Sequence, residues 1–293
     1  MKLVYDFSVT SLRRRHAPVL ALDFAAQTYR ASGSPVALSS VVSFARGSTA
    51  MRVAASGQLE TVAVDVPRFD HAFGTGVPLG VLIESSATNV LDYSNDFAQS
   101  YWTPYASKPT FTSEHIAPDG TASARSWNCS LTTGGAGGAR GGILVVNGSY
   151  TGTATASVWL KASAPLTMRF GHSDSTSMMI NVTSEWQRFT YTAPLPNGQS
   201  RIFMLYEDVN TDIDVSIWGA QTEIGGQATS VIQTSGSPAS RAADVVGLTG
   251  ISGVYDVTLT YDDNSTEALV AQTITEGWWP SLSRPRLKSL LAV

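Results

Sequence analysis

The chain has a single cysteine, Cys129, and few charged residues. One cysteine excludes an intrachain disulfide framework and a zinc site built from several cysteine ligands. Charged residues make up 14% of the 293 positions, against roughly 25% in an average soluble domain. The surface must therefore owe its polarity mainly to Ser, Thr, Asn, Gln and Gly, a balance typical of extracellular or virion β-proteins.

The sequence also lacks the patterns of a membrane span, a secretory signal and a basic nucleic-acid-binding surface. No uninterrupted apolar run approaches the roughly 18 residues of a membrane span. The basic run at 13–16 precedes only a short apolar patch at 18–26, which Asp23 interrupts. A net charge of −4 offers no concentrated basic face for nucleic acid. We therefore expect no membrane insertion, no nucleic-acid partner, and synthesis in a bacterial cytoplasm without a signal peptide.

The motifs of catalysis are also absent. No Gly-x-Ser-x-Gly elbow occurs, and the four histidines lie in unrelated contexts without metal-ligand spacing. His71 is interpreted as a structural hydrogen-bonding residue. The sequence predicts no catalytic residue, no metal site and no cofactor, so the chain is not expected to be an enzyme.

An acidic stretch at 207–214 imitates part of a calcium-binding loop. Asp212 and Asp214 fall on its alternate positions, but Ile213 replaces the glycine of the sharp turn and Gly219 replaces the final glutamate. An EF-hand is therefore excluded. A solvated strand edge is the default interpretation, while a weaker calcium site near Asp212 and Asp214 stays open.

What the chain does contain is a series of short alternating segments between 156 and 224. Three of them, at 157–161, 184–189 and 215–221, each carry a tryptophan, and two more lie at 166–170 and 201–206. A period of two is typical of strands with one buried face, and Gly, Pro, Asn, Asp and Ser separate the segments, as in turns. The pattern predicts an all-β protein with a central jelly-roll β-sandwich.

The flanking sequence divides into two smaller sections. Residues 1–89 form a β-rich N-terminal region, with a hairpin expected to turn at 56–57. The sandwich is expected to occupy 90–246, and residues 247–293 hold a C-terminal β-hairpin and tail.

The alternation also predicts a candidate sugar site. Sugars bind where aromatic faces and polar side chains converge. Trp159, Arg169 and Tyr206 are expected to share a solvent-facing sheet, with Glu207 as a further candidate beside Tyr206. The alternative is that these residues pack under loops or at subunit contacts. Trp186 and Trp218 are assigned to the core.

An ordered set of short motifs resembles phage head-spike-fibre and tail-fibre-associated proteins, which also occur on prophages and gene transfer agents. Each motif alone is weak, but their order over most of the chain is specific. They lie at 67–71, 80–84, 87–91, 93–97, 102, 117–121, 157–162, 184–188, 218–225, 240–245 and 261–266. Thr222 departs from the Leu that such sequences tend to carry.

This resemblance implies a carbohydrate-binding-module-like jelly roll on a virion spike or fibre that adheres to the capsule or other polysaccharide of the host cell. Partners would be that polysaccharide and other virion proteins, the protein would lie on the virion surface, and a homo-oligomer is expected because multivalency raises avidity. Two alternatives remain: a structural virion adaptor, or a capsule-degrading enzyme that uses Glu207 or Asp208.

Overall fold

The computed structural model describes residues 18–106, 109–128, 141–147, 150–173, 175–195, 201–207 and 214–293. Within these ranges the chain consists of β-strands and one short 3-10 helix, Leu38–Ser40. None of the described helical structure is long and apolar enough to cross a membrane. The predicted all-β fold class is confirmed.

The chain forms two compact units. One contains residues 1–43 together with 246–293, and the other contains residues 44–245. The predicted division into 1–89, 90–246 and 247–293 differs from this arrangement. Strands from the two ends of the chain join one sheet, which no local sequence pattern reveals.

The unit formed by the two ends is an antiparallel sheet with the order β23-β22-β24-β1-β2-β3. Its strands are β1 (Leu20–Asp23), β2 (Thr28–Ala31), β3 (Ser34–Pro35), β22 (Gly253–Tyr261), β23 (Thr266–Ile274) and β24 (Arg286–Ala292). β1 pairs with β24, placing Leu22 opposite Leu290. β22 and β23 form the predicted C-terminal hairpin. Residues that alternate along these strands, such as Leu20 and Leu22, are buried.

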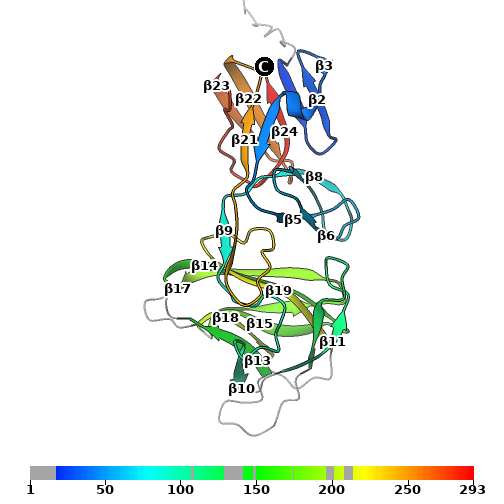
Figure 1. The fold of residues 1–293 in the computed structure, drawn as a ribbon, viewed down its shortest axis with the longest axis vertical. Helices are drawn as coiled ribbons and strands as arrows, with labels where there is room; N and C mark the ends of the chain where they lie inside the picture. The colour runs from blue at the N-terminus through cyan, green and yellow to red at the C-terminus, as the bar shows by residue number, and fades with distance from the viewer. Residues whose placement is uncertain are drawn as a thin grey trace, which may run out of the picture. The chain divides into compact units, whose positions relative to one another are not determined.

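The larger unit contains two five-stranded antiparallel sheets (Figure 1). Sheet I has the order β11 (Thr110–His115), β12 (Ala124–Asn128), β19 (Val215–Ile224), β14 (Gly152–Ala162), β17 (Gln187–Leu195). Sheet II has the order β10 (Thr103–Ala106), β13 (Gly141–Val146), β18 (Arg201–Glu207), β15 (Leu166–Ser173), β16 (Thr176–Val182). Four of the five segments predicted between 156 and 224 lie within strands of this sandwich, and in the fifth, 184–189, the strand begins only at Gln187.

The hydrophobic core lies between the two sheets. On β14, Val158 and Leu160 point into it, as their alternation predicted, and on β15 Met168 and Phe170 do the same. Trp102 packs edge-on against Phe203 at 5.4 Å between ring centroids. Aromatic rings of this size supply much of the apolar area that a sandwich must bury. His172 ties the sheets together, since its Nδ1 lies 2.9 Å from the Ile202 carbonyl and its Nε2 lies 3.1 Å from the Ala154 carbonyl.

Among its described residues, the same unit also contains six short strands outside the two sheets. They are β5 (Ala50–Val53), β6 (Leu59–Val62), β7 (Arg68–His71), β8 (Pro78–Leu82), β9 (Ala87–Asn89) and β20 (Ala239–Arg241). β5 and β6 form the hairpin predicted at 56–57, with Gly57 at a φ of +81°. This hairpin packs on the outer face of sheet I through Met51, Val53 and Leu59. The chain passes between the units through β4 (Val42–Ala45) and β21 (Val245–Leu248).

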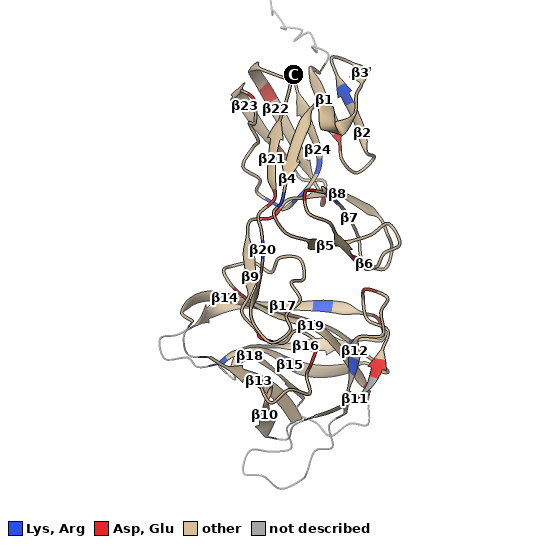
Figure 2. Ribbon diagram, in the orientation of Figure 1, with Lys and Arg blue, Asp and Glu red and all other residues tan. Residues whose placement is uncertain are grey.

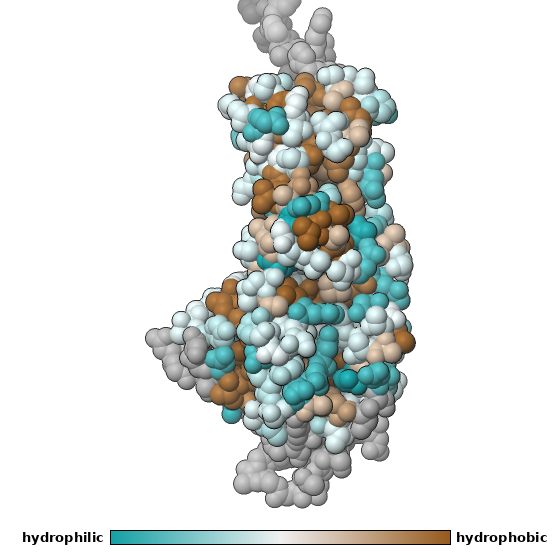
Figure 3. Space-filling model, viewed as in Figure 1, coloured by the Kyte–Doolittle hydropathy of each residue, from teal (hydrophilic) through white to brown (hydrophobic). Residues whose placement is uncertain are grey.

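The low charge content is visible on the strands. Most of the described ribbon in Figure 2 carries neither an acidic nor a basic residue. On the face drawn in Figure 3, pale, weakly polar residues cover much of the area between smaller apolar and strongly hydrophilic patches. A charged side chain on an outer strand face is therefore a local exception.

Candidate glycan-binding face of sheet II

The structure separates the four residues predicted to form a sugar site. Trp159 lies on β14 of sheet I, whereas Arg169 and Tyr206 lie on β15 and β18 of sheet II. Arg169 and Tyr206 are direct cross-strand partners. Glu207 is the last residue of β18, and its side chain lies outside the described residues.

The prediction that Trp159 faces solvent is wrong. Its side chain points away from the inter-sheet core, as the alternation required, but only 6% of it is exposed. The ring packs at 4.6 Å from Phe73 and joins a cluster that includes Met51 and Val231. Trp218, its cross-strand partner, is buried in the same cluster, whereas Trp186 is only partly buried. A segment distant in sequence covers this face of sheet I.

The opposite outer face, that of sheet II, carries a continuous row of residues in register. The row runs Tyr105, Gly142, Tyr206, Arg169, Met179, with one residue from each strand. With roughly 4.8 Å between neighbouring strands, the row spans about 19 Å of backbone. A parallel row on the same face runs Thr103, Leu144, Met204, Gly171, Ser177. Neither row contains a carboxylate.

Gly142 allows two aromatic rings to meet above the sheet. A Cβ at this position would collide with the Tyr206 side chain and lie 2.6 Å from the Leu205 carbonyl oxygen. Without it, Tyr105 and Tyr206 lean together from the flanking strands and stack at 4.6 Å, with their planes 28° apart. An aromatic pair bridging a strand glycine both restores packing lost at the glycine and presents a flat surface.

A guanidinium group lies beyond each end of this tyrosine pair. The Cζ of Arg201 is 5.7 Å from the centroid of the Tyr105 ring, and the Cζ of Arg169 is 6.0 Å from that of Tyr206. Both distances fall within the range of cation–π attraction. The array is therefore guanidinium, ring, ring, guanidinium, built from four residues of three strands.

Within the array the two tyrosines differ in exposure. Tyr206 is 1% exposed, so the prediction that it faces solvent is wrong, and it acts instead as the support on which Tyr105 stacks. Tyr105 and Arg169 are partly exposed. Tyr105 was missed in the sequence, because its contact with Tyr206 depends on Gly142 of the strand between them. A glycine inside an apolar strand pattern, here before 143–145, was the available signal.

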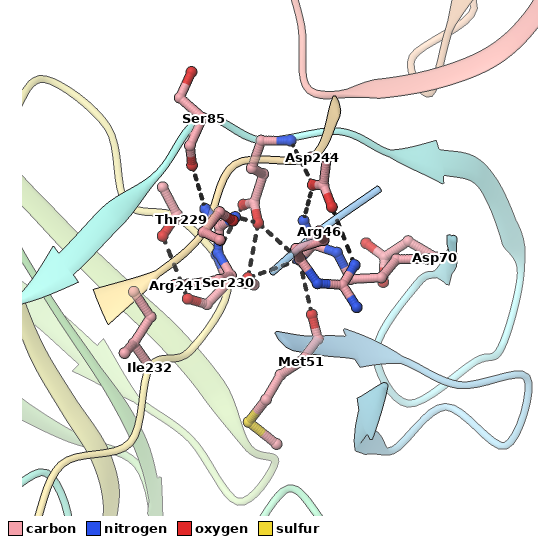
Figure 4. Close-up of polar contacts among 12 residues, drawn as sticks. Arg46, Met51, Asp70, Ser85, Thr229, Ser230, Ile232, Arg241 and Asp244 are labelled. Atoms are coloured by element: carbon pink, nitrogen blue, oxygen red, sulfur yellow. Dashed lines mark hydrogen bonds and ion pairs between the residues drawn. The ribbon is translucent and has the colours of Figure 1, made fainter. Parts of the chain in front are cut away.

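A second polar cluster in this unit is buried (Figure 4). Asp244 accepts from Arg68 and lies 3.1 Å from Nη1 of Arg46, and Arg68 also binds Glu84 at 2.8 Å. Ser230 donates to Glu84 through its backbone N–H at 2.8 Å and its hydroxyl at 2.7 Å. The cluster joins the segment before the sandwich to the segment after it.

The cluster sets the charge state of Glu84. Burial alone would raise the pKa of this carboxyl, but Arg68, Arg241 and the Ser230 hydroxyl outweigh burial and hold the pKa below its usual value. Buried charges are tolerated only when they are paired and hydrogen-bonded in this way. The cluster therefore has a structural role. Through the hydrogen bond from Arg68 to the Met51 carbonyl it holds β5, which packs on Trp159.

A cleft of about 220 Å³ lies beside this cluster. Its buried lining includes Met51, Val231 and Ile232, and its exposed lining includes Thr61 and Gln233.

Other residues considered from the sequence have local structural roles. His71 contacts the Val53 carbonyl through Nδ1 at 3.1 Å, as a structural residue. Asp214 accepts from the Ser126 hydroxyl at 2.5 Å, while Asp212 and Cys129 lie outside the described residues. Over the ranges that the structure describes, no group of three or more His, Cys, Asp or Glu side chains is arranged to hold a metal ion.

The sandwich matches carbohydrate-binding modules of known structure at low similarity. A family 29 carbohydrate-binding module from Piromyces equi is 10% identical, with 48% of this chain and 93% of the module covered and a TM-score of 0.34. The CBM22-1 xylan-binding domain of Paenibacillus barcinonensis Xyn10C is 14% identical, with 48% and 94% covered and a TM-score of 0.33. No protein-family model and no curated protein matches the chain. At these values the likeness says nothing about a ligand, which must be argued from the side chains.

Proposed function

We propose that the chain is a non-catalytic glycan-binding protein that uses the outer face of sheet II. On a phage or gene-transfer-agent particle it would lie at the virion surface and adhere to host-cell polysaccharide. The bacteriophage setting rests on the ordered sequence motifs, and the glycan-binding role rests on the face itself.

The tyrosine pair flanked by guanidinium groups is the observation that carries the proposal. A sugar ring has apolar C–H faces and a polar hydroxyl edge, so it suits a partly exposed aromatic ring next to hydrogen-bond donors. Tyr105 offers the ring, Tyr206 holds it from below, and Arg169 supplies donors from the adjacent strand. Thr167 and Asn181, an exposed pair further along β15 and β16, add a hydroxyl and an amide.

Glycan binding is tested by replacing the platform without disturbing the core. Tyr105→Ala should abolish or strongly weaken binding to a panel of bacterial capsular polysaccharides, measured by biolayer interferometry. Thr61→Trp, which fills the 220 Å³ cleft, is the matched control and should bind normally. Loss of binding in Thr61→Trp with normal binding in Tyr105→Ala would move the site to the cleft and refute the proposed face.

The particle role needs a separate test. Particles with and without the protein are compared by electron microscopy and by adsorption to capsulated and uncapsulated cells. Particles that lack the protein should be intact but should adsorb poorly to capsulated cells. We expect several copies per particle, since linked weak sites raise avidity by roughly 10²–10⁴.

One observation favours the adaptor alternative. Val254 and Val270, on the β22–β23 hairpin, are 64% and 71% exposed, and exposed apolar side chains often mark contacts between proteins. If the protein is a structural adaptor, deleting it should prevent particle assembly, and Val270→Asp should reproduce that defect while polysaccharide binding persists.

A further inference from the structure

Arg169 differs from the buried arginines of the same unit. Arg46 binds Asp244 and several carbonyl groups. Arg68 binds Glu84, Asp244 and the Met51 carbonyl group. Arg169 makes a 3.5 Å contact from Nη1 to the Ser177 hydroxyl and lies 6.0 Å from the centroid of the Tyr206 ring, but it pairs with none of the described carboxylates. A partly exposed guanidinium that has no carboxylate partner among the described residues can donate to an external group.

The surroundings of Arg169 favour a negative partner. Its immediate neighbours are Tyr206, Met179 and Ser177, and the two cross-strand rows contain no carboxylate. No described carboxylate forms an ion pair with this guanidinium. With Nη1 directed to Ser177 and Nε buried, Nη2 is the donor that remains for an external group, and a charge-assisted hydrogen bond to a carboxylate is stronger than one to a neutral oxygen.

We infer that the glycan is anionic and that Arg169 binds its carboxylate, as found on a uronic acid or another acidic sugar. This inference rests on the proposed function, because it assigns a ligand class to the same face. Tyr105 supports the sugar ring, and Arg169 lies one strand beyond Tyr206, near enough for one acidic oligosaccharide to contact both.

The protein as a whole does not attract anions. Its formal net charge is −4, so non-specific adsorption to a polyanion is disfavoured and a preference for acidic glycans must come from a local site. That local site should be sensitive to ionic strength, since part of its affinity is electrostatic.

The experiment compares each uronic-acid-containing capsular polysaccharide with its carboxyl-reduced form, in which every carboxylate has become a hydroxymethyl group. Backbone, linkages and ring faces stay the same. The wild-type full chain should bind the native form at least 10-fold more tightly, and this difference should shrink as salt is raised.

The variants assign that difference to one residue. Arg169→Gln should weaken binding of the native form by roughly 10- to 100-fold, the range expected for a charge-assisted hydrogen-bonded pair, and should leave the reduced form nearly unchanged. Arg169→Lys should retain part of the preference, since it keeps the charge but loses the planar guanidinium group. Arg125→Gln is the control: it removes a guanidinium from sheet I, where Arg125 pairs with Glu114 at 2.9 Å.

Two outcomes overturn the inference, and they are distinguishable. If Tyr105→Ala abolishes binding while Arg169→Gln changes neither form, or changes both equally, the face binds glycan but does not select for the carboxylate. If no polysaccharide binds in either form and Tyr105→Ala has no effect, the proposed function itself fails. Unchanged thermal unfolding of each variant would show that lost binding is not lost folding.

Discussion

Glu84→Gln isolates the contribution of the buried cluster to the stability of the larger unit. The substitution preserves shape but removes the negative charge that faces Arg68 and Arg241. It also places an amide NH₂ where both carboxylate oxygens now accept, so a donor must face Ser230 or Arg68. Breaking one partner of a buried pair costs about 3–5 kcal/mol.

That cost should be visible in thermal unfolding. The unit spans residues 44–245, and for a domain of this size each kcal/mol lowers the midpoint by roughly 2–4 °C. We therefore expect circular dichroism to show a midpoint about 6–20 °C lower. Glu60→Gln is the control, because Glu60 pairs with Arg52 at 2.6 Å but is 42% exposed, and exposed pairs contribute less than about 1 kcal/mol.

The same variant should change the response to acid. The folded-state pKa of Glu84 lies below its ordinary value of 4.5, so its stabilisation is fully present above that pH and is lost as pH falls through the folded-state pKa. Wild type should therefore lose stability between about pH 4.5 and lower values more steeply than Glu84→Gln. A midpoint within 2 °C of wild type at neutral pH, or identical acid limbs, would refute the reasoning about this cluster.

Three further predictions follow from the sandwich. Trp159→Ala should lower the free energy of unfolding by about 3–5 kcal/mol in a denaturant titration while leaving glycan affinity unchanged, because this ring packs beneath another segment; lost affinity in a stably folded variant would contradict its assignment. Gly142→Ala should destabilise by about 1–3 kcal/mol through overpacking against Tyr206 and weaken glycan binding; normal binding would separate the tyrosine stack from the site. Burial raises the pKa of Tyr101 to about 12, so its stabilisation is present below the unfolded-state pKa of about 10 and is lost as pH rises towards 12. Because the pKa of Tyr29 is also raised to about 12, Tyr101→Phe should reduce the phenolate absorbance of that step without removing it, and an unchanged titration would exclude the assignment.

Local periodicity was sufficient to predict several strands of the sandwich but not what covers them. The alternation around Trp159 correctly separated its side chain from Val158 and Leu160. Whether the other side was open depended on Phe73, which lies far away in the sequence and packs on the Trp159 ring. A period of two identifies two faces of a strand, and only tertiary pairing decides which of them meets solvent.

Two residues of the candidate face on sheet II were predicted from the sequence, and a third was not. Arg169 and Tyr206 were expected on one outer face, and strand pairing places them side by side. Tyr105 could not be added, because its stacking on Tyr206 depends on Gly142 between them. A short strand and a glycine carry almost no periodic signal, although together they create the platform.

Three of the motifs that make the sequence resemble spike and fibre proteins contribute residues to the buried ion-pair cluster. Arg68, Glu84, Arg241 and Asp244, from three separate motifs, meet in the buried cluster. Tyr105 and Arg169 lie outside every motif. The resemblance therefore includes the buried cluster but not the two residues proposed to contact the glycan, and under that proposal these two can change without disturbing the cluster. Substituting Tyr105 or Arg169 should alter the polysaccharide preference and leave the unfolding midpoint nearly constant. Substituting Glu84 should lower the unfolding midpoint and leave the polysaccharide preference unchanged.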